Sequence, residues 1–149
     1  MREGWEVKKL GEVFITATGT TPPKNCKDYY GEFIPFVKPP ELCDTLLHSA
    51  ADNLSEKGAV VARILPPYSI LVSCIGNLGK IAMNSVPVAF NQQINAIMPN
   101  SKKGIPEFLF YQTLSTSFKE QLESFASGTT VPIVNKSKFN SKSIIRMCG

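Results

Sequence analysis

The chain has 149 residues, of which 43% are hydrophobic, and it carries a formal net charge of +4 at pH 7. This length and apolar content suffice for one ordinary hydrophobic core, so we expect a single domain over residues 1–149. No apolar run approaches the roughly 20 residues that a membrane-spanning helix needs, and the first residues lead into no apolar signal segment. We therefore expect a cytoplasmic protein.

Metal-binding residues are sparse. The four cysteines are scattered without a Cys-x-x-Cys pair, and His48 is the only histidine of the sequence. A structural zinc site usually takes its four ligands from two closely spaced pairs, so we expect no metal site.

The basic residues concentrate in the second half of the sequence. Residues 1–60 hold 7 basic and 9 acidic side chains, whereas residues 61–149 hold 9 basic and 3 acidic ones. No acid follows Glu123, while Lys136, Lys138, Lys142 and Arg146 do. This tail is a candidate phosphate-facing surface, because lysine and arginine near a duplex release condensed counterions. The alternative is a solvated face that only keeps the protein soluble.

The first third of the chain predicts short elements around a long loop. Residues 5–8 favour a strand, and Leu10, Val13 and Phe14 follow at helical spacing. The glycine and two prolines of residues 19–23 end that helix and open a long polar loop, a kind of segment that is more often functional than idle. Residues 33–37 favour an edge strand, because Pro35 cannot donate to a β-ladder.

The centre of the chain predicts a sheet. Residues 70–75 form a short, β-branched apolar run, which indicates a strand buried on both faces. A glycine-punctuated turn over residues 76–80 follows. From Asn91 the Asn-Gln-Gln stretch leads into an alternating strand over residues 93–98, in which Gln93 and Asn95 lie on a wetter face.

The last third predicts one long amphipathic helix over residues 106–126, with an apolar stripe that packs on the sheet. The stripe consists of Ile105, Phe108, Tyr111, Leu114, Phe118, Leu122 and Phe125. A short turn at residues 135–139 and a strand at residues 143–147 complete the chain. Together these elements predict a mixed α/β, α+β-like fold with a central, partly antiparallel twisted sheet flanked by helices.

Two stretches have the form of catalytic motifs but lack the residues that do the chemistry. The turn at residues 76–80 lacks the glycine spacing of a phosphate-binding loop, and Ile81 replaces the Ser or Thr that holds magnesium. Leu65-Pro66-Pro67-Tyr68 has the form of a DNA adenine methyltransferase motif, but Leu65 cannot accept a hydrogen bond from the target amino group. The sequence therefore predicts no catalysis.

Several short motifs occur in an order and spacing that are specific when taken together. They are Trp5-x-x-x-x-Leu10-Gly11-Glu12, Gly19-x-Thr21-Pro22, Ile34-Pro35-Phe36-Val37, Ser55-x-x-Gly58, Gly76-x-x-Gly79, Asn91-Gln92-Gln93, Phe108-Leu109-Phe110-Tyr111-x-x-Leu114 and Gly128-Thr129-Thr130. This pattern, over nearly the whole chain, resembles the target recognition domain of type I restriction-modification DNA specificity (S) subunits.

The resemblance implies an α/β domain that reads one half of a split DNA sequence and is not itself a catalyst. In that family, methyltransferase (M) subunits methylate adenine with S-adenosylmethionine, and restriction (R) subunits join the assembly. The resemblance thus places S-adenosylmethionine, ATP and Mg in the partner subunits and no cofactor in this chain. The alternative function is a protein-interaction module that docks a methyltransferase without useful DNA affinity of its own.

The sequence departs from the family pattern at its end. The family continues into a long spacer helix, whereas this sequence stops at Gly149. We expect a half-subunit, a truncated gene product or an excised domain, and two copies could pair as a homodimer to restore a bipartite site.

The residues that read bases vary within the family, so we choose candidates by their chemistry. Asn and Gln can bond adenine, Lys and Arg can bond guanine or phosphate, and Thr can do either. The predicted DNA-binding residues are Thr20, Thr21, Lys24, Asn25, Lys27, Asn77, Lys80, Asn91, Gln92, Thr129, Thr130, Lys136 and Lys138. Asn91 and Gln92, with Gln93, could instead be amides that tie loops to the sheet.

Overall fold

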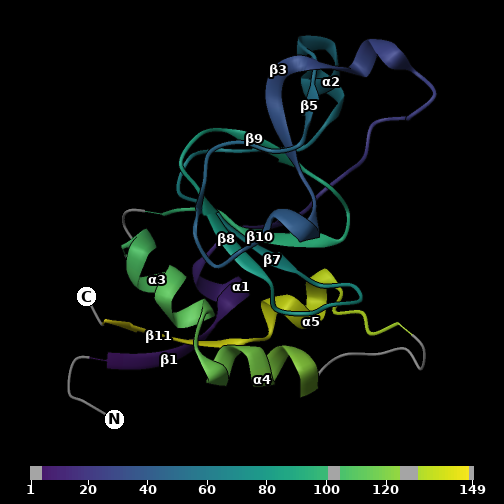
Figure 1. Cartoon of the computed structure of the whole chain (residues 1–149). Helices are drawn as coiled ribbons and strands as arrows, with labels where there is room; N and C mark the ends of the chain where they lie inside the picture. The colour runs from purple at the N-terminus through teal and green to yellow at the C-terminus, as the bar shows by residue number, and fades with distance from the viewer. Residues whose placement is uncertain (1–4, 101–104, 125–130, 148–149) are drawn as a thin grey trace.

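The protein folds around three β-sheets, of which one forms its centre (Figure 1). The structure is a computed structural model, and it describes residues 5–100, 105–124 and 131–147. The predicted mixed α/β class is confirmed by the alternation of short strands and helices along these residues.

The central sheet has five strands in the order β2-β10-β7-β8-β4. Its strands are β2 (Thr16–Thr18), β10 (Ile94–Ile97), β7 (Ile70–Ser73), β8 (Ile81–Asn84) and β4 (Leu46–Leu47). All neighbours are antiparallel except β4 and β8, which are parallel. All four residues of β7 are buried, so the prediction of a strand covered on both faces is confirmed.

A second sheet of four strands covers one face of the central sheet. Its order is β5 (Asp52–Leu54), β3 (Tyr30–Val37), β9 (Val88–Phe90) and β6 (Ile64–Leu65). The single-turn helices η1 (Lys27–Tyr29) and η2 (Pro39–Glu41) flank β3. Helix α2 (Glu56–Val61) is capped by Ser55, whose hydroxyl accepts a hydrogen bond from the Gly58 N–H at 3.1 Å.

The prediction of an edge strand around Pro35 is wrong, because β3 lies inside the four-stranded sheet. Pro35 is opposite Asn53 of β5, while the pairing with β9 begins only at Phe36. The missing N–H of Pro35 therefore falls where β3 has only β5 as a neighbour, just before the pairing with β9 begins.

A two-stranded sheet joins the ends of the described chain. β1 (Trp5–Lys9) pairs antiparallel with β11 (Ser143–Met147), and Trp5 is opposite Met147. Helix α1 (Leu10–Val13) follows β1, and α5 (Lys136–Asn140) precedes β11. These assignments confirm the predicted first strand, the short helix after it, the turn near residue 135 and the last strand.

The long predicted helix is two helices, α3 (Pro106–Thr113) and α4 (Thr116–Ser124). The Thr113 and Ser115 hydroxyls donate to the carbonyl oxygens of Phe110 and Gln112 and so satisfy the end of α3. The Ser115 hydroxyl also accepts from the Phe118 N–H at 3.3 Å, at the start of α4.

Part of the predicted apolar stripe is also wrong. Ile105, Phe108 and Tyr111 are 67%, 43% and 69% exposed, whereas Leu109 and Phe110 are buried. Phe118 and Leu122 of α4 are buried as predicted, and Phe125 lies outside the described residues. No helix among the described residues is both long and apolar enough to cross a bilayer.

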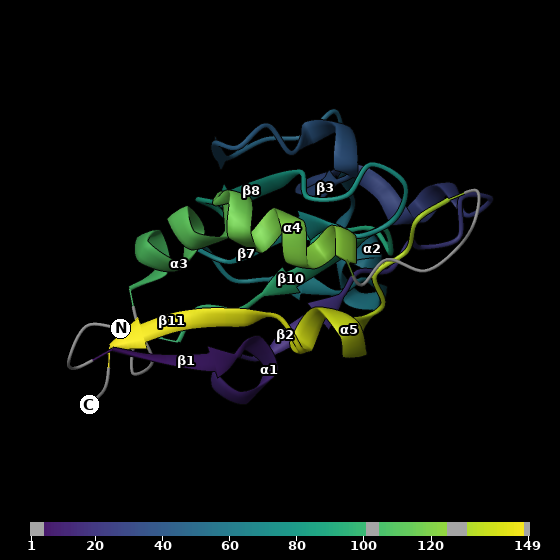
Figure 2. The same ribbon diagram turned by 90° about the horizontal axis from the view of Figure 1, so that it is seen from below.

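The core has two main layers, one on each face of the central sheet. Ile70 and Val72 of β7 pack toward helices α1, α3, α4 and α5, while Leu71 packs toward the four-stranded sheet. Figure 1 shows the four-stranded sheet above the central sheet and the helices below it, and Figure 2 shows α3 and α4 crossing in front of the central strands. Each fully buried leucine, isoleucine or phenylalanine contributes about 1.5–3 kcal/mol to folding.

The wetter face predicted for β10 does not exist, since all four of its residues are buried. Ile94 and Ala96 face the four-stranded sheet, and Ile97 faces the helices. Asn95 is 3% exposed and is tolerated because its side chain is hydrogen-bonded on both sides.

Candidate functional site

Three connections that carry predicted site residues leave the central sheet at one edge, where four of its strands begin or end. Since neighbouring strands are antiparallel, β2 and β7 end at the edge where β10 and β8 begin. Three connections leave this edge: the first loop (residues 19–29), the amide turn (residues 91–93) and the glycine turn (residues 75–80). The connections that were spread along the sequence are therefore neighbours in space.

The first loop and the amide turn are joined by direct contacts. The N–H groups of Gly19 and Thr20 donate to the carbonyl oxygens of Ile94 (3.2 Å) and Phe90 (3.0 Å). The Thr21 hydroxyl donates to Oε1 of Gln92. A Cβ atom on Gly19 would lie 2.1 Å from the Asn91 carbonyl oxygen, so only glycine allows this close approach.

The amide turn divides its polar groups between structure and solvent. Asn91 is 7% exposed, and its Oδ1 accepts from the Gln93 N–H at 3.1 Å while its Nδ2 donates to Oε1 of Gln93 at 3.2 Å. This stretch was predicted as the start of a strand, but these bonds make it a turn between β9 and β10. Gln92 is exposed, and its Oε1 accepts the hydrogen bond from the Thr21 hydroxyl.

The glycine turn is built around the Ser73 side chain. The Ser73 hydroxyl donates to the Asn77 carbonyl oxygen at 2.6 Å and accepts from the Lys80 N–H at 2.8 Å. Gly76 and Gly79 have φ angles of +75° and +79°, which explains the glycine at both positions. Within this turn the Asn77 side chain is exposed and Lys80 is half-buried.

The segment before α5 extends the same edge. The Gly76 N–H donates to the Pro132 carbonyl oxygen at 2.9 Å, and the Val134 N–H donates to that of Cys74 at 2.8 Å. Asn135 caps α5, since its Oδ1 accepts from the Lys138 N–H at 2.9 Å. Figures 1 and 2 both place this segment and the first loop on the same side of the molecule.

The predicted DNA-binding residues differ in how far they reach solvent. The exposed ones are Lys24, Asn25, Lys27, Asn77, Gln92 and Lys136, the half-buried ones are Thr20, Thr21, Lys80 and Lys138, and the buried one is Asn91. Thr129 and Thr130 lie outside the described residues. The exposed set provides amide and ammonium donors, which suit base edges and phosphates.

One member of the predicted basic surface lies inside the protein. Lys142 is 0% exposed, and burial lowers the pKa of its ammonium to about 8. The Cys74 thiol is also buried, and desolvation raises its pKa to about 11, against a smaller lowering by its hydrogen bond with Asn95. Lys142 therefore belongs to the core, and the tail presents fewer cations than its sequence indicates.

Sequence reasoning missed one exposed cation at this edge, Arg63. It lies between α2 and β6, and its backbone N–H donates to Oγ1 of Thr20 at 3.1 Å. A single charge inside the otherwise apolar run of residues 59–65 was the available signal.

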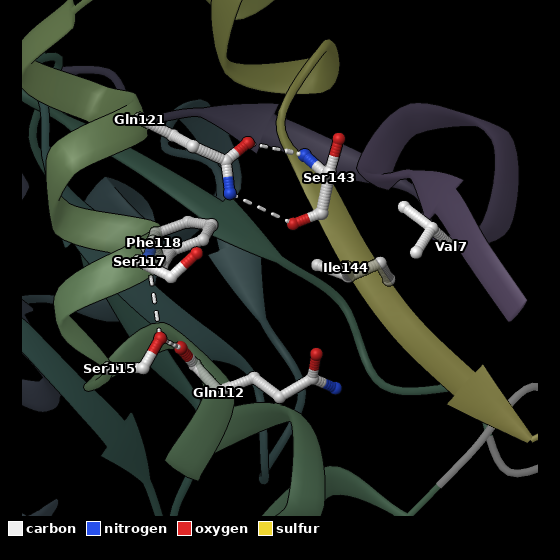
Figure 3. Close-up of a pocket in the computed structure, with 8 residues that line it drawn as sticks. All are labelled: Val7, Gln112, Ser115, Ser117, Phe118, Gln121, Ser143 and Ile144. Atoms are coloured by element: carbon white, nitrogen blue, oxygen red, sulfur yellow. Dashed lines mark hydrogen bonds between the residues drawn. The ribbon is translucent and has the colours of Figure 1, made fainter. Parts of the chain in front are cut away.

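A separate hollow lies away from this edge. It has a volume of about 360 Å³ and lies between helices α3 and α4 and strand β11 (Figure 3). Gln121 crosses part of it, because its Oε1 accepts from the Ser143 N–H at 2.7 Å and its Nε2 donates to the Ser143 carbonyl oxygen at 3.2 Å. Its described lining includes none of the predicted DNA-binding residues.

Comparisons with known proteins agree with the resemblance seen in the sequence. Residues 2–145 match the family model described as "Type I restriction modification DNA specificity domain". The chain is 37% identical over 146 residues to the type I restriction enzyme HindI specificity subunit of Haemophilus influenzae, covering 95% of this chain and 32% of that protein. It is 30% identical over 134 residues to the MjaIX specificity subunit of Methanocaldococcus jannaschii, covering 86% and 31%.

Solved structures show the same fold. The HsdS subunit from Thermoanaerobacter tengcongensis superposes with a TM-score of 0.73 at 17% identity, over 99% of this chain and 34% of that one. A chain from a type I R-M system complex gives a TM-score of 0.72 at 18% identity, over 99% and 35%. The chain thus spans about a third of the length of these relatives.

Proposed function

Because the chain belongs to the family of type I restriction-modification DNA specificity domains, we propose that it binds double-stranded DNA and reads one half of a bipartite sequence. The observation that carries this proposal is the convergence of the first loop, the amide turn, the glycine turn and the segment before α5 at one sheet edge. These segments lie on one side of the molecule (Figure 1), and they carry exposed amide and ammonium donors.

The donors divide into two roles by their chemistry. Gln92 and Asn25 are exposed amides that can bond base edges, and Gln92 is oriented by the Thr21 hydroxyl. Lys24, Lys27 and Lys136 are exposed ammonium groups that suit the phosphate backbone. Asn91 serves the site indirectly, because its side chain holds the amide turn in shape.

The partners follow from the family. We propose that residues 1–149 act as one recognition domain in the cytoplasm, that methyltransferase and restriction subunits of a type I system supply the catalysis, and that this chain supplies none. S-adenosylmethionine, ATP and Mg would then bind those partners. Pairing of two copies in a homodimer would raise the affinity for a bipartite site through avidity.

The test is selection from a randomised duplex pool at two salt concentrations, with sequencing of the DNA that is retained. A short enriched motif that survives the higher salt is the expected result and identifies the half-site. Salt-sensitive retention without a motif would limit the chain to phosphate binding. No retention at either salt would overturn the proposal and favour a protein-interaction module.

A further inference from the structure

Two consecutive threonines of the first loop form hydrogen bonds with two different residues that could contact DNA, Gln92 and Arg63. Thr21 donates its hydroxyl to Gln92, while Oγ1 of Thr20 accepts the backbone N–H of Arg63 at 3.1 Å. The Thr20 N–H in turn donates to the Phe90 carbonyl oxygen at 3.0 Å. Thr20 therefore links Arg63 to the strand that leads into the amide turn.

The register of the four-stranded sheet independently places Arg63 beside the strand that leads into the amide turn. β6 pairs antiparallel with β9, with Ile64 opposite Ala89 and Leu65 opposite Val88. Continuing this register by one residue brings Arg63 beside Phe90, two residues before Gln92. Arg63 thus stands at the end of a paired strand, so its backbone is held more firmly than that of a residue in the middle of a long loop.

The Arg63 guanidinium is available for a ligand. The residue is exposed, and the ion pairs among the described residues join Lys38 to Asp52, Lys57 to Asp28 and Lys119 to Asp44, so none uses Arg63. The acid of the first loop, Asp28, is engaged by Lys57 at 3.5 Å. A planar fork of N–H donors in this position matches the O6 and N7 acceptors of guanine.

We infer that Arg63 reads a guanine in the major groove, beside the base contacted by Gln92, and that Thr20 is its positioning residue. This inference rests on the proposed DNA-binding function and adds a specificity-determining residue to it. A rigid backbone anchor favours base reading, because the O6 and N7 acceptors of guanine can be approached only along the base edge, whereas phosphate oxygens can be approached from several directions.

The test compares binding of the full chain and its variants to the selected half-site and to duplexes with single base changes. Wild type should lose about 5- to 150-fold in affinity when the relevant guanine is replaced, the range for one bidentate contact. Replacement by 7-deazaguanine, which lacks the N7 acceptor, should reproduce part of that loss. Arg63→Ala should bind guanine and its replacements equally.

Two conservative variants distinguish base recognition by the Arg63 guanidinium from an effect of its positive charge alone. Arg63→Lys keeps the charge but not the fork, so it should keep most of the affinity for unrelated DNA and lose most of the guanine preference. Thr20→Ser keeps the hydroxyl and should keep the preference, whereas Thr20→Val should reduce it. Lys8→Ala, at an exposed lysine of β1 outside the site, is the matched control and should change neither quantity.

Each remaining outcome overturns the inference. A motif that persists unchanged in Arg63→Ala, or a uniform loss for all sequences, would assign Arg63 to no contact or to a phosphate while leaving the proposed function intact. Absence of any motif for wild type would overturn the proposed function and this inference together. Circular dichroism of each variant confirms that the comparison is made between folded proteins.

Discussion

The Nδ2 group of Asn95 donates a hydrogen bond of 3.1 Å to the carbonyl oxygen of Val134, which fastens the segment before α5 to the central sheet. The same side chain accepts a hydrogen bond of 2.6 Å from the Thr18 hydroxyl. One buried amide on β10 therefore joins β2, β10 and the segment that leads to Lys136. Together with the backbone hydrogen bonds of Pro132 and Val134, this contact holds the segment before α5 against the sheet.

Replacing Asn95 with alanine should destabilise the protein by about 2–4 kcal/mol, because it leaves the buried Val134 carbonyl oxygen and the half-buried Thr18 hydroxyl without their partner. Urea unfolding measures this change. Asn77→Ala, at an exposed amide of the glycine turn, is the control and should change stability by less than about 0.5 kcal/mol. Equal effects of the two substitutions would contradict the structural role given to Asn95.

The close approach at Gly19 leads to a second prediction. An alanine Cβ there would lie 2.1 Å and 2.4 Å from the carbonyl oxygens of Asn91 and Phe90, so the first loop must move away from the amide turn. Gly19→Ala should cost about 1–3 kcal/mol of stability and at least about tenfold in DNA affinity. Thermal unfolding and DNA titration measure the two effects.

Gly31→Ala is the matched control for that substitution. Its nearest new contacts would be the Cβ and Cα atoms of Ser55 at 3.1 Å and 3.2 Å, and it lies on β3, away from the sheet edge. Because these contacts are longer than those at Gly19, a smaller loss of stability than that of Gly19→Ala and unaltered DNA binding are expected. Normal DNA affinity of Gly19→Ala would show that the contact between first loop and amide turn is not needed for binding.

Local sequence pattern predicted the elements whose burial follows from their own residues. The apolar run at residues 70–73 became a fully buried strand, and the spacing of Leu10 and Val13 became a buried helical turn. The stripe from Ile105 to Leu114 misled, because three successive spacings of three residues rotate by about 60° each relative to a helix face. That stripe winds around the helix, and Leu109 and Phe110 face the core instead.

The candidate site was predictable as a set of loops but not as an assembled surface. The polar composition of the first loop and the glycine turn indicated functional segments, and both reach the same sheet edge. Which of their residues are available to contact DNA, and which hold the structure together, depends on contacts with residues that are distant in the sequence. Asn91 is used by its own turn, Lys142 lies in the core, and Arg63 reaches the site through the β6–β9 pairing.

The burial of Lys142 predicts a pH dependence of stability. Its pKa is about 8 in the folded protein and 10.5 in its ordinary state, so between these values the unfolded chain binds more protons and stability rises with pH. The Cys74 thiol, with a pKa raised from 9.0 to about 11, acts in the opposite direction from about pH 8 upward, and below pH 9 its effect is smaller than that of Lys142. The interval from pH 8 to 9 therefore reports mainly on Lys142.

Lys142→Met should remove this rise, which can reach about 1 kcal/mol and is limited to about 1.4 kcal/mol per pH unit for one proton. The measurement is the free energy of unfolding of wild type and variant in urea at several pH values from 7.5 to 9. Identical slopes for the two proteins would mean that the Lys142 ammonium is not the group that titrates.

The exposed lysine at the start of α5 separates phosphate contacts from base contacts. Lys136→Ala should weaken binding to every sequence and reduce the slope of log affinity against log salt by about 1, because one phosphate contact and its counterion release are lost. Asn25→Ala should instead relax the preference at one base pair, by about 1–3 kcal/mol, and leave the salt slope unchanged.

Titrations at four salt concentrations with the selected motif and its single-base variants measure both quantities, and Lys8→Ala again serves as the control. A change of base preference in Lys136→Ala with an unchanged salt slope would place Lys136 at a base edge, and no effect of either substitution would move the DNA-binding surface away from this side of the sheet.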